Sequence, residues 1–271
     1  MLSALLTVVA MAAIVIAVPS LWVKERLVDT EGFISMVGPL ADDQRVKDYL
    51  ADQITAEVTS RVAIPGAEGV VAPIARGYTD SPQFRADFAD VVGQQHAWLF
   101  DDPASNPGDT LQLDITDMVN RVIATTPVQA TVPGPVTVPL SEGATGLDAG
   151  RYHGVGQQIT LIAYVSVIVA VAASVLALLV ARRRGTVLAW LGIGGLLAAA
   201  AAWATSIYIA SLAGDEIANA QDGGKTVAQL AIDTAEQQLQ QVAGITAIAG
   251  AVVLVAGIVL RLIAGVGAAR R

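Results

Sequence analysis

Two aspartates near the middle of the chain are the clearest candidates for acid–base chemistry. Asp114 and Asp117 flank a turn between a short extended segment and a helix. Glycoside hydrolysis needs two carboxyl groups roughly 5 to 9 Å apart, and the second acid could be Asp42, Asp43 or Asp52. The helix dipole also favours acids at helix starts, so these aspartates have a structural interpretation too. The sequence alone assigns no catalytic residue.

His96 is a further candidate, because histidine gains and loses a proton near neutral pH. It falls on a predicted helix beside Trp98. The chain contains no Gly-x-Ser-x-Gly motif, so no nucleophile accompanies this histidine. Since nothing supplies a triad partner, we expect a partly buried structural histidine. His153 adjoins an apolar stretch and is expected at a membrane interface.

The segment from Asp101 to Asp109 carries oxygen ligands of the kind that calcium prefers. These are Asp101, Asp102, Asn106 and Asp109, and their spacing lacks the alternation of an EF-hand loop. A helix end followed by a solvated turn is expected, and calcium binding stays open. The absence of Cys and the presence of only two His argue against thiolate and all-histidine metal sites within one chain. No metal or cofactor is predicted.

Two glycine-rich segments imitate nucleotide-binding motifs. Residues 222–226 end like a P-loop, but Asn219 stands where the first glycine is required. Gly192, Gly194 and Gly195 imitate a dinucleotide fingerprint inside an apolar stretch, where close helix packing is the expected role. No nucleotide binding is predicted. The net charge of −8 argues against nucleic acid, because phosphates attract clustered Lys and Arg.

Four long stretches without charged residues indicate a membrane protein. A bilayer core of about 30 Å needs about 20 apolar residues in a helix. We predict a mainly α-helical protein with four transmembrane helices and a mostly helical extracytoplasmic domain that contains a short β element. The first helix lacks a basic start and an A-x-A cleavage site, so it is expected to be an uncleaved signal anchor. The transmembrane helices are expected at 3–22, 158–181, 187–210 and 242–260.

Arginines predict the direction of these helices. An arginine triplet lies in the link at 182–186, and three more arginines lie in the tail at 261–271. Such residues are retained on the cytoplasmic side, so both termini are expected in the cytoplasm of a cell with this protein in its plasma membrane. Segment 23–157, with 19 acids and 9 bases, and segment 211–241, with 5 acids and 1 base, are then extracytoplasmic.

Helical periodicity and turn residues predict the elements of these two segments. The second segment is expected to break at Gly223-Gly224, to form a helix over 225–241 that leads into the fourth span, and to pack on the first segment. For the first segment we predict four helices, from Asp42 or Asp43 to about Val62, over 69–77, from Pro82 to near Asp101 and from Thr116 to about Thr125. We also predict a strand over 111–115 and the two arms of a hairpin over 128–132 and 136–140. A linker over 141–156 then leads back to the membrane.

A recurring pattern follows the first span. It consists of Trp22, Asp29-Thr30, Phe33, Val37, Pro39-Leu40-Ala41, Asp43, Val46 and Ile54 through Val58, with a looser match at Trp98 to Asp102 and Leu111 to Ile115. In these residues the chain resembles actinobacterial four-span integral membrane proteins of uncharacterised function, which have an external helical domain after the first span. The resemblance implies an inner-membrane location with the domain facing the cell wall. It supplies no catalytic residues.

We therefore expect a multi-pass protein of the cell envelope, a non-enzymatic accessory or scaffold more than an enzyme. Its partners would be the lipid bilayer and either an envelope protein or a second copy, through small-residue helix faces. Two alternatives stay open. An extracytoplasmic enzyme acting on cell-wall or lipid-linked sugars would unite Asp114 or Asp117 with another acid or with His96 in a concave site. A small channel or transporter would need a water-filled path, although the predicted spans carry no charge at their centres. The small-residue faces are Gly195 with Ala199, and Ala243 with Ala247 and Ala251.

Overall fold

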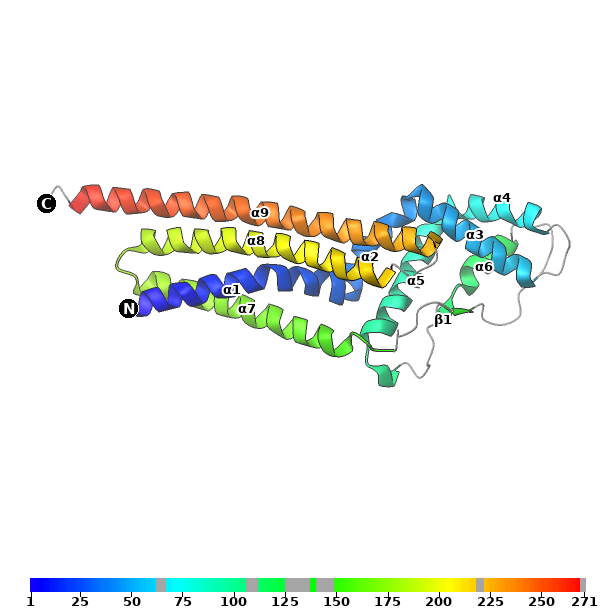
Figure 1. The fold of residues 1–271 in the computed structure, drawn as a ribbon, viewed down its shortest axis with the longest axis horizontal. Coiled ribbons are helices and arrows are strands. Elements are labelled where there is room, and N and C mark those ends of the chain that lie inside the picture. Colours follow the sequence, from blue (N-terminus) through cyan, green and yellow to red (C-terminus); the bar gives the residue numbers. More distant parts are fainter. Residues whose placement is uncertain (62–66, 106–111, 125–136, 140–148, 218–221, 269–271) are drawn as a thin grey trace. The chain divides into compact units, whose positions relative to one another are not determined.

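The chain is mainly helical and divides into two compact units. The computed structural model describes residues 1–61, 67–105, 112–124, 137–139, 149–217 and 222–268 (Figure 1). The first unit, called the apolar unit here, comprises Met1–Val28, Val155–Leu212 and Ala235–Arg271. The second, called the polar unit, comprises Asp29–Gly154 and Ala213–Thr234. Most of segment 23–157 and most of segment 211–241 thus belong to the same unit, which agrees with the expectation that the second segment packs on the first.

Within the described residues, four helices are long and apolar enough to cross a membrane. They are Leu2–Val28, His153–Val180, Arg184–Gly214 and Lys225–Ile263, with mean hydropathies between 1.9 and 2.6. Large apolar side chains along them are exposed, as lipid-facing side chains would be; Ile248 is 68% exposed and Leu179 is 67% exposed. These spans belong to α1 (Leu2–Val23, continued as a π-helix over Lys24–Val28), α7 (His153–Val180), α8 (Arg184–Ile217) and α9 (Asp222–Ala268).

Glycine allows α8 and α9 to pack backbone against backbone. A Cβ atom built on Gly192 would lie 2.7 Å from the carbonyl oxygen of Gly250, and one built on Gly185 would lie 2.8 Å from that of Gly257. On another face of α8, a Cβ on Gly194 would lie 3.0 Å from Cγ of Met11 in α1. Close helix packing, the role expected for the glycines of this span, is confirmed at these positions.

The packed face of α9 differs from the predicted one. Ala243 is buried as expected, but Ala247 is half-buried and Ala251 is exposed. The face that meets α8 instead continues through Gly250 and Gly257. Steps of seven residues follow one side of a helix over two turns, whereas steps of four drift away from it. The face that α9 uses within the chain is therefore the one that contains Gly250 and Gly257, and the predicted face is used only at Ala243.

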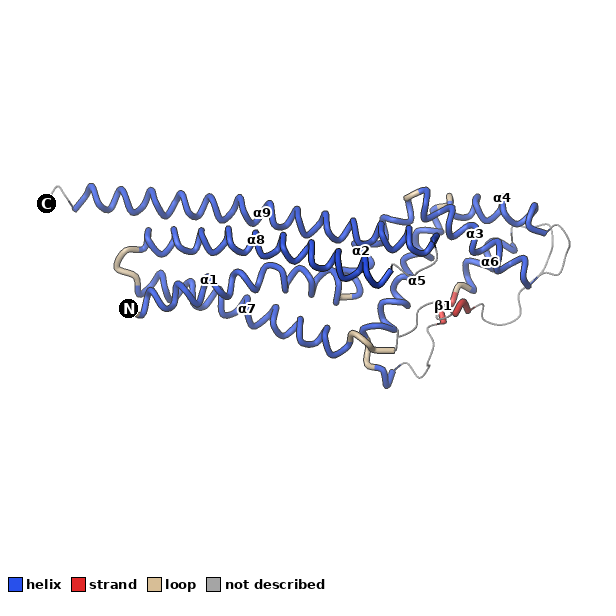
Figure 2. Tube along the Cα trace, viewed as in Figure 1, coloured by secondary structure: helices blue, strands red, loops and turns tan. Residues whose placement is uncertain are grey.

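The polar unit is built mostly from helices, which Figure 2 shows in blue. Its core contains Val46, Ile54 and Val58 of α3, which confirms part of the predicted apolar stripe. From α5 it takes Phe84, Phe88 and Val92, which recur every four residues on one helix face. The helices are α2 (Thr30–Val37), α3 (Gln44–Arg61), α4 (Ala67–Thr79), α5 (Pro82–Phe100) and α6 (Thr116–Ala124), with 3-10 turns at Gly38–Asp42 and Pro103–Ser105.

In the described part of the polar unit, two short strands accompany these helices. β1 (Gln112–Asp114) pairs antiparallel with β2 (Thr137–Pro139), with Leu113 opposite Val138. β2 lies within the predicted hairpin arm at 136–140. The other predicted arm, at 128–132, and most of the predicted linker lie outside the described residues.

α9 corrects the expectation of a break at Gly223-Gly224. The helix begins at Asp222 and continues through both glycines to Ala268. Glycine disfavours a helix interior by about 1 kcal/mol, but in the first turn the backbone N–H groups have no helical partner to lose. The glycines therefore start the helix here and do not interrupt it.

Candidate functional site

The polar unit contains a pocket of about 600 Å³ formed by α5, the end of β1 and the start of α6. Asp87, Asp90, Asp114 and Asp117 line it, together with apolar residues that include Met118. The pocket thus unites the two aspartates singled out from the sequence with two further acids. It is the kind of concave site that the enzymatic alternative requires, although the partner acids are not those expected.

Asp87 is the most enclosed acid of the pocket. Its side chain is 12% exposed and forms an ion pair with Arg121, whose Nε lies 2.9 Å away. It accepts hydrogen bonds from Nη2 of Arg121 at 3.2 Å and from the hydroxyl of Tyr78 at 2.5 Å. Burial raises the pKa of Tyr78, and the hydrogen bond to Asp87 raises it further. The Tyr78 hydroxyl therefore stays protonated and donates. This contact links α4, α5 and α6, so Asp87 has a structural partner on each side.

Asp114 is held by the start of α6. One of its carboxylate oxygens accepts hydrogen bonds from the backbone N–H of Thr116 at 2.9 Å and from the Thr116 hydroxyl at 2.5 Å. The backbone N–H of Asp114 donates to Oε1 of Gln94 at 3.1 Å. The Asp114 carboxylate thus satisfies donors that a helix start leaves unpaired. The expectation that Asp114 has a structural role at the start of a helix is confirmed.

Asp90 and Asp117 also line the pocket, and both are exposed, as is Asp114. Asp90 accepts a hydrogen bond from Nε2 of Gln94 at 2.9 Å. Asp117 lies in the first turn of α6, where the helix dipole favours a negative charge. A general acid for sugar hydrolysis is usually a buried carboxyl group whose pKa burial has raised. The exposure of these two acids gives them no such environment.

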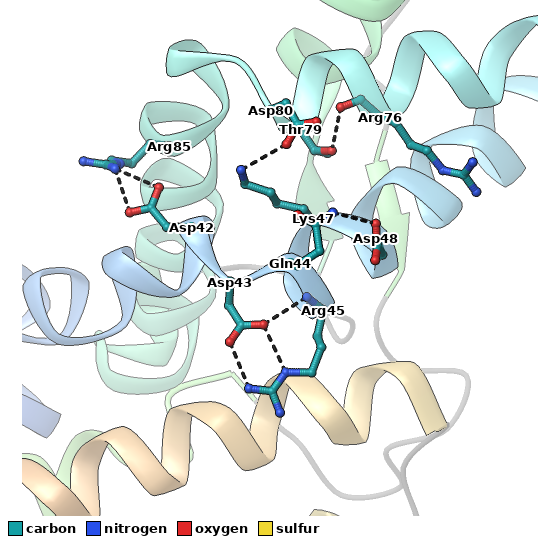
Figure 3. A network of polar contacts seen from close by, with 10 residues as sticks. All are labelled: Asp42, Asp43, Gln44, Arg45, Lys47, Asp48, Arg76, Thr79, Asp80 and Arg85. Atoms are coloured by element: carbon teal, nitrogen blue, oxygen red, sulfur yellow. Dashed lines mark hydrogen bonds and ion pairs between the residues drawn. The ribbon is translucent and has the colours of Figure 1, made fainter.

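The acids expected to partner Asp114 lie outside the pocket. Figure 3 shows Asp42 beside Arg85, whose Nη2 lies 2.6 Å from one carboxylate oxygen. It also shows Asp43 accepting from the backbone N–H and the guanidinium of Arg45, at distances of 2.9 to 3.0 Å. These hydrogen bonds, the side-chain bond foremost, lower the pKa of Asp43. Neither Asp42 nor Asp43 lines the pocket that contains Asp114 and Asp117, and both carboxylates bind arginines instead.

Two more ion pairs lie within the described part of the polar unit, outside the pocket. Lys47 of α3 lies 3.1 Å from Asp80, which follows α4. Asp52, the third expected partner, is 70% exposed. Its Oδ1 lies 3.9 Å from Nη2 of Arg76, which is a long distance for an ion pair. It does not line the pocket either. Asp42 and Asp80 thus join separate elements of the polar unit without lining the pocket, and Asp43 pairs with Arg45 two residues along the chain.

His96 is a buried structural residue, as expected. Its side chain is 2% exposed, its ring stacks on Phe100 with 4.5 Å between centroids, and Nδ1 lies 3.2 Å from the hydroxyl of Thr30. Asp87 and His96 are nine residues apart, or two and a half helical turns, so they occupy opposite faces of α5. His96 therefore does not belong to the pocket.

The chain turns sharply at Gly150, before α7 begins. Gly150 has a φ of 67°, and its N–H donates to the carbonyl oxygen of Trp98. Nδ1 of His153 lies 2.9 Å from the carbonyl oxygen of Phe100. His153, expected at a membrane interface, thus ties the start of α7 to the end of α5 inside the polar unit.

The candidate calcium loop is described only in part. Oδ1 of Asp102 accepts from the backbone N–H of Ala104 at 2.9 Å, while Asn106 and Asp109 lie outside the described residues. Among the residues that are described, no group of three or more His, Asp or Glu side chains could hold a metal ion. Calcium binding at this loop stays a prediction.

The interior of the apolar unit offers little polarity to an ion or solute. Its buried positions are mostly alanines, among them Ala10, Ala163 and Ala202, each with 0% exposure. Ser166 and Ser206 are buried too, but their hydroxyls donate to carbonyl oxygens of their own helices. In the described part of this unit, buried side chains are uncharged. A tightly packed bundle gives no support to the channel alternative.

Two of the pocket's four acids, Asp87 and Asp90, were not identified as candidates from the sequence. Asp87 and Asp90 lie three residues apart on α5, and Gln94 is one turn further on the same face, opposite Phe84, Phe88 and Val92. That polar face was visible as a pattern. The neighbours that complete the pocket, β1 and α6, could not be inferred from it.

Comparison of the chain with protein-family models, with curated proteins and with solved structures found no match.

Proposed function

We propose that this chain is a multi-pass protein of the cell envelope that serves as a non-enzymatic accessory or scaffold. Its apolar helices sit in a lipid bilayer. Its polar unit lies outside the cytoplasm and presents an acidic surface to a partner protein. The orientation is supported by the arginines of the predicted cytoplasmic segments. The actinobacterial plasma membrane is the setting that the resemblance implies.

The observation that carries this proposal is the surplus of carboxylates in a folded polar unit. Residues 29–154 and 213–234 contain 22 acids and 8 bases, a net charge of −14. The bases Arg45, Lys47, Arg85 and Arg121 are already paired with acids inside the unit. The excess negative charge is left for other molecules, and complementary charge speeds and orients association.

In-cell crosslinking, followed by purification in mild detergent and mass spectrometry, tests the proposal. A foreign protein recovered in stoichiometric amount, through crosslinks to residues of the polar unit, is the expected result. Recovery of self-crosslinked chains alone would overturn the accessory role. So would turnover of a substrate that depends on this chain's own residues.

The pocket supports a second candidate function, an enzyme acting on cell-wall or lipid-linked sugars. Its specific support is the gathering of Asp114 and Asp117 with Asp87 and Asp90. We rank it second because the carboxylates of Asp87 and Asp114 hold structural partners. Incubation of the full chain with lipid-linked sugars and cell-wall fragments would decide, since an enzyme would release products and the double variant Asp90→Asn/Asp117→Asn would not.

A further inference from the structure

We infer that the pocket between α5 and the start of α6 receives a lysine or arginine side chain from a segment of the partner protein. The inference rests on the proposed function and deepens it, because it names the binding surface and the chemistry of the partner. It is carried by three features of the pocket: its concavity, its apolar floor and the unpaired negative charge at its rim.

The distribution of ion pairs leaves the rim of the pocket uncompensated. Within the part of the chain that the structure describes, the ion pairs of the polar unit include Asp87 but not its pocket neighbours Asp90, Asp114 and Asp117. Asp90 and Asp114 accept hydrogen bonds from neutral groups, which leave their charge in place. A cationic side chain is the complement of such a rim.

The floor of the pocket suits the stem of that side chain. Met118 is 4% exposed, and Val91 and Ile115 are half-buried beside it. Lysine and arginine lay their methylene stems along apolar surface while the charged head reaches polar groups. A pocket of about 600 Å³ has room for one long side chain and the backbone that carries it.

A divalent cation fits the pocket less well than a cationic side chain. Calcium takes six to eight oxygen ligands, whereas one oxygen of Asp114 already accepts two hydrogen bonds from Thr116. The described residues also contain no group of three ligands placed for a metal ion. A free alkylamine shares the chemistry of lysine, so the test must separate the two.

The experiment uses the full chain in nanodiscs of zwitterionic lipid and a fluorescein-labelled pentapeptide, Gly-Lys-Val-Lys-Gly. Fluorescence polarisation should show saturable binding that weakens as salt is added, because salt screens exposed charges. A Gly-Glu-Val-Glu-Gly peptide should not bind. Butylamine should compete only at concentrations far above that of the peptide. Competition at equal concentration would identify a free-amine site and overturn the inference.

Variants connect binding to the pocket. Asp90→Asn/Asp117→Asn should weaken peptide binding about tenfold or more. The matched control is Asp48→Asn/Asp52→Asn, since Asp48 is also exposed and accepts from the amide of Gln44 four residues away, outside the pocket. Equal weakening by both variants would show general attraction to an acidic surface and would overturn the pocket.

A second pair of variants tests the pocket without removing an acid. One variant places a lysine in the pocket, and the other places a lysine elsewhere as a control. Ala86 is exposed, lines the pocket and precedes Asp90 by one helical turn, so Ala86→Lys should offset part of the rim's negative charge, occupy the pocket and weaken binding about tenfold or more. Ala56→Lys, at an exposed position of α3, should leave binding unchanged. Undiminished binding to Ala86→Lys would contradict the inference. The two proposals can fail separately. If the chain crosslinks a partner in cells but peptide binding does not depend on the pocket, the proposed function stands and the inference about the pocket is overturned.

Discussion

Gly192 of α8 faces the backbone of Leu254 in α9 with no room for a side chain between them. A Cβ atom on this glycine would overlap the Leu254 nitrogen and lie 2.7 Å from the carbonyl oxygen of Gly250. Two helix backbones cannot move independently at such a distance. The contact between α8 and α9 is thus a defining feature of the apolar unit.

We expect Gly192→Val to destabilise the chain by about 1 to 3 kcal/mol, the range for overpacking a well-packed interior. Thermal unfolding in detergent measures the loss. Gly244→Ala is the control, because nothing lies within 4 Å of a Cβ at Gly244. Equal melting temperatures for the two variants would show that α8 and α9 separate readily.

The turn at Gly150 should also reject a side chain. A Cβ there would lie 2.5 Å from Cδ of Pro103 and 2.9 Å from the carbonyl oxygen of Asp101, and the φ of 67° adds strain. Gly150→Ala should therefore cost about 1 to 3 kcal/mol. Gly154→Ala, where nothing lies within 4 Å, should be neutral or should stabilise α7 by up to about 1 kcal/mol. Thermal unfolding of both variants compares them directly.

Asp87 should matter far more for stability than an acid in an exposed ion pair. Asp87→Ala leaves Arg121 and the buried Tyr78 hydroxyl without their acceptor, and we expect a loss of about 2 to 3 kcal/mol. Asp52→Ala, in a pair of exposed side chains 3.9 Å apart, should change stability by less than about 0.5 kcal/mol. Denaturant unfolding of the full chain measures both. Similar losses would contradict the structural role of Asp87.

Tyr78 gives the chain a stability that is lost at alkaline pH. Its pKa is raised by burial and by Asp87, whereas tyrosine in an unfolded chain loses its proton near pH 10. Above about pH 10 the unfolded state therefore binds fewer protons than the folded state, and stability falls as pH rises. Tyr78→Phe should flatten this fall. Part of the slope should remain, because burial also raises the pKa of Tyr49.

The same variant should cost about 1 kcal/mol at neutral pH, through loss of the hydrogen bond to Asp87. Tyr208→Phe is the control, since Tyr208 is 65% exposed. Denaturant unfolding across the alkaline range provides the comparison. If the free energy of unfolding of Tyr78→Phe fell with pH as steeply as that of the unchanged chain, Tyr78 would not be a source of the alkaline instability.

The orientation of the chain can be tested with single cysteines, because the natural sequence has none. Ala104→Cys places a thiol at an exposed position of the polar unit, and Arg183→Cys places one in the arginine link. In intact cells, a membrane-impermeant maleimide should label only the first. Labelling of the second alone would reverse the proposed topology.

The candidate spans could be predicted because they depend on local composition. An uncharged stretch that is long enough to cross a bilayer satisfies its own backbone as a helix, whatever its neighbours are. The same reasoning failed at Gly223-Gly224, where glycine was taken to end a helix and instead lies in its first turn. A helix end depends on which backbone groups need partners, and the residues alone do not settle that.

The pocket depends on tertiary structure and could be predicted only in part. Asp114 and Asp117 stood out because they flank a turn. Asp87 was not connected to them, since its partners Tyr78 and Arg121 come from two other helices. Conversely, Asp42 and Asp43 were plausible partners by residue type, yet nearby arginines bind both. Residue type gave the candidates, and only the packing of α4, α5 and α6 selects among them.

The glycine contacts between α8 and α9 also bear on how the protein is made. Gly185 finds its partners at Gly257 and Arg261, more than seventy residues later in synthesis. Until the last span has entered the bilayer, the glycine face of α8 is therefore exposed to lipid, because α9 is not yet there to cover it. A chain cut short before Gly250 would keep that face permanently exposed. We expect such fragments to associate with another helix that offers a matching glycine face.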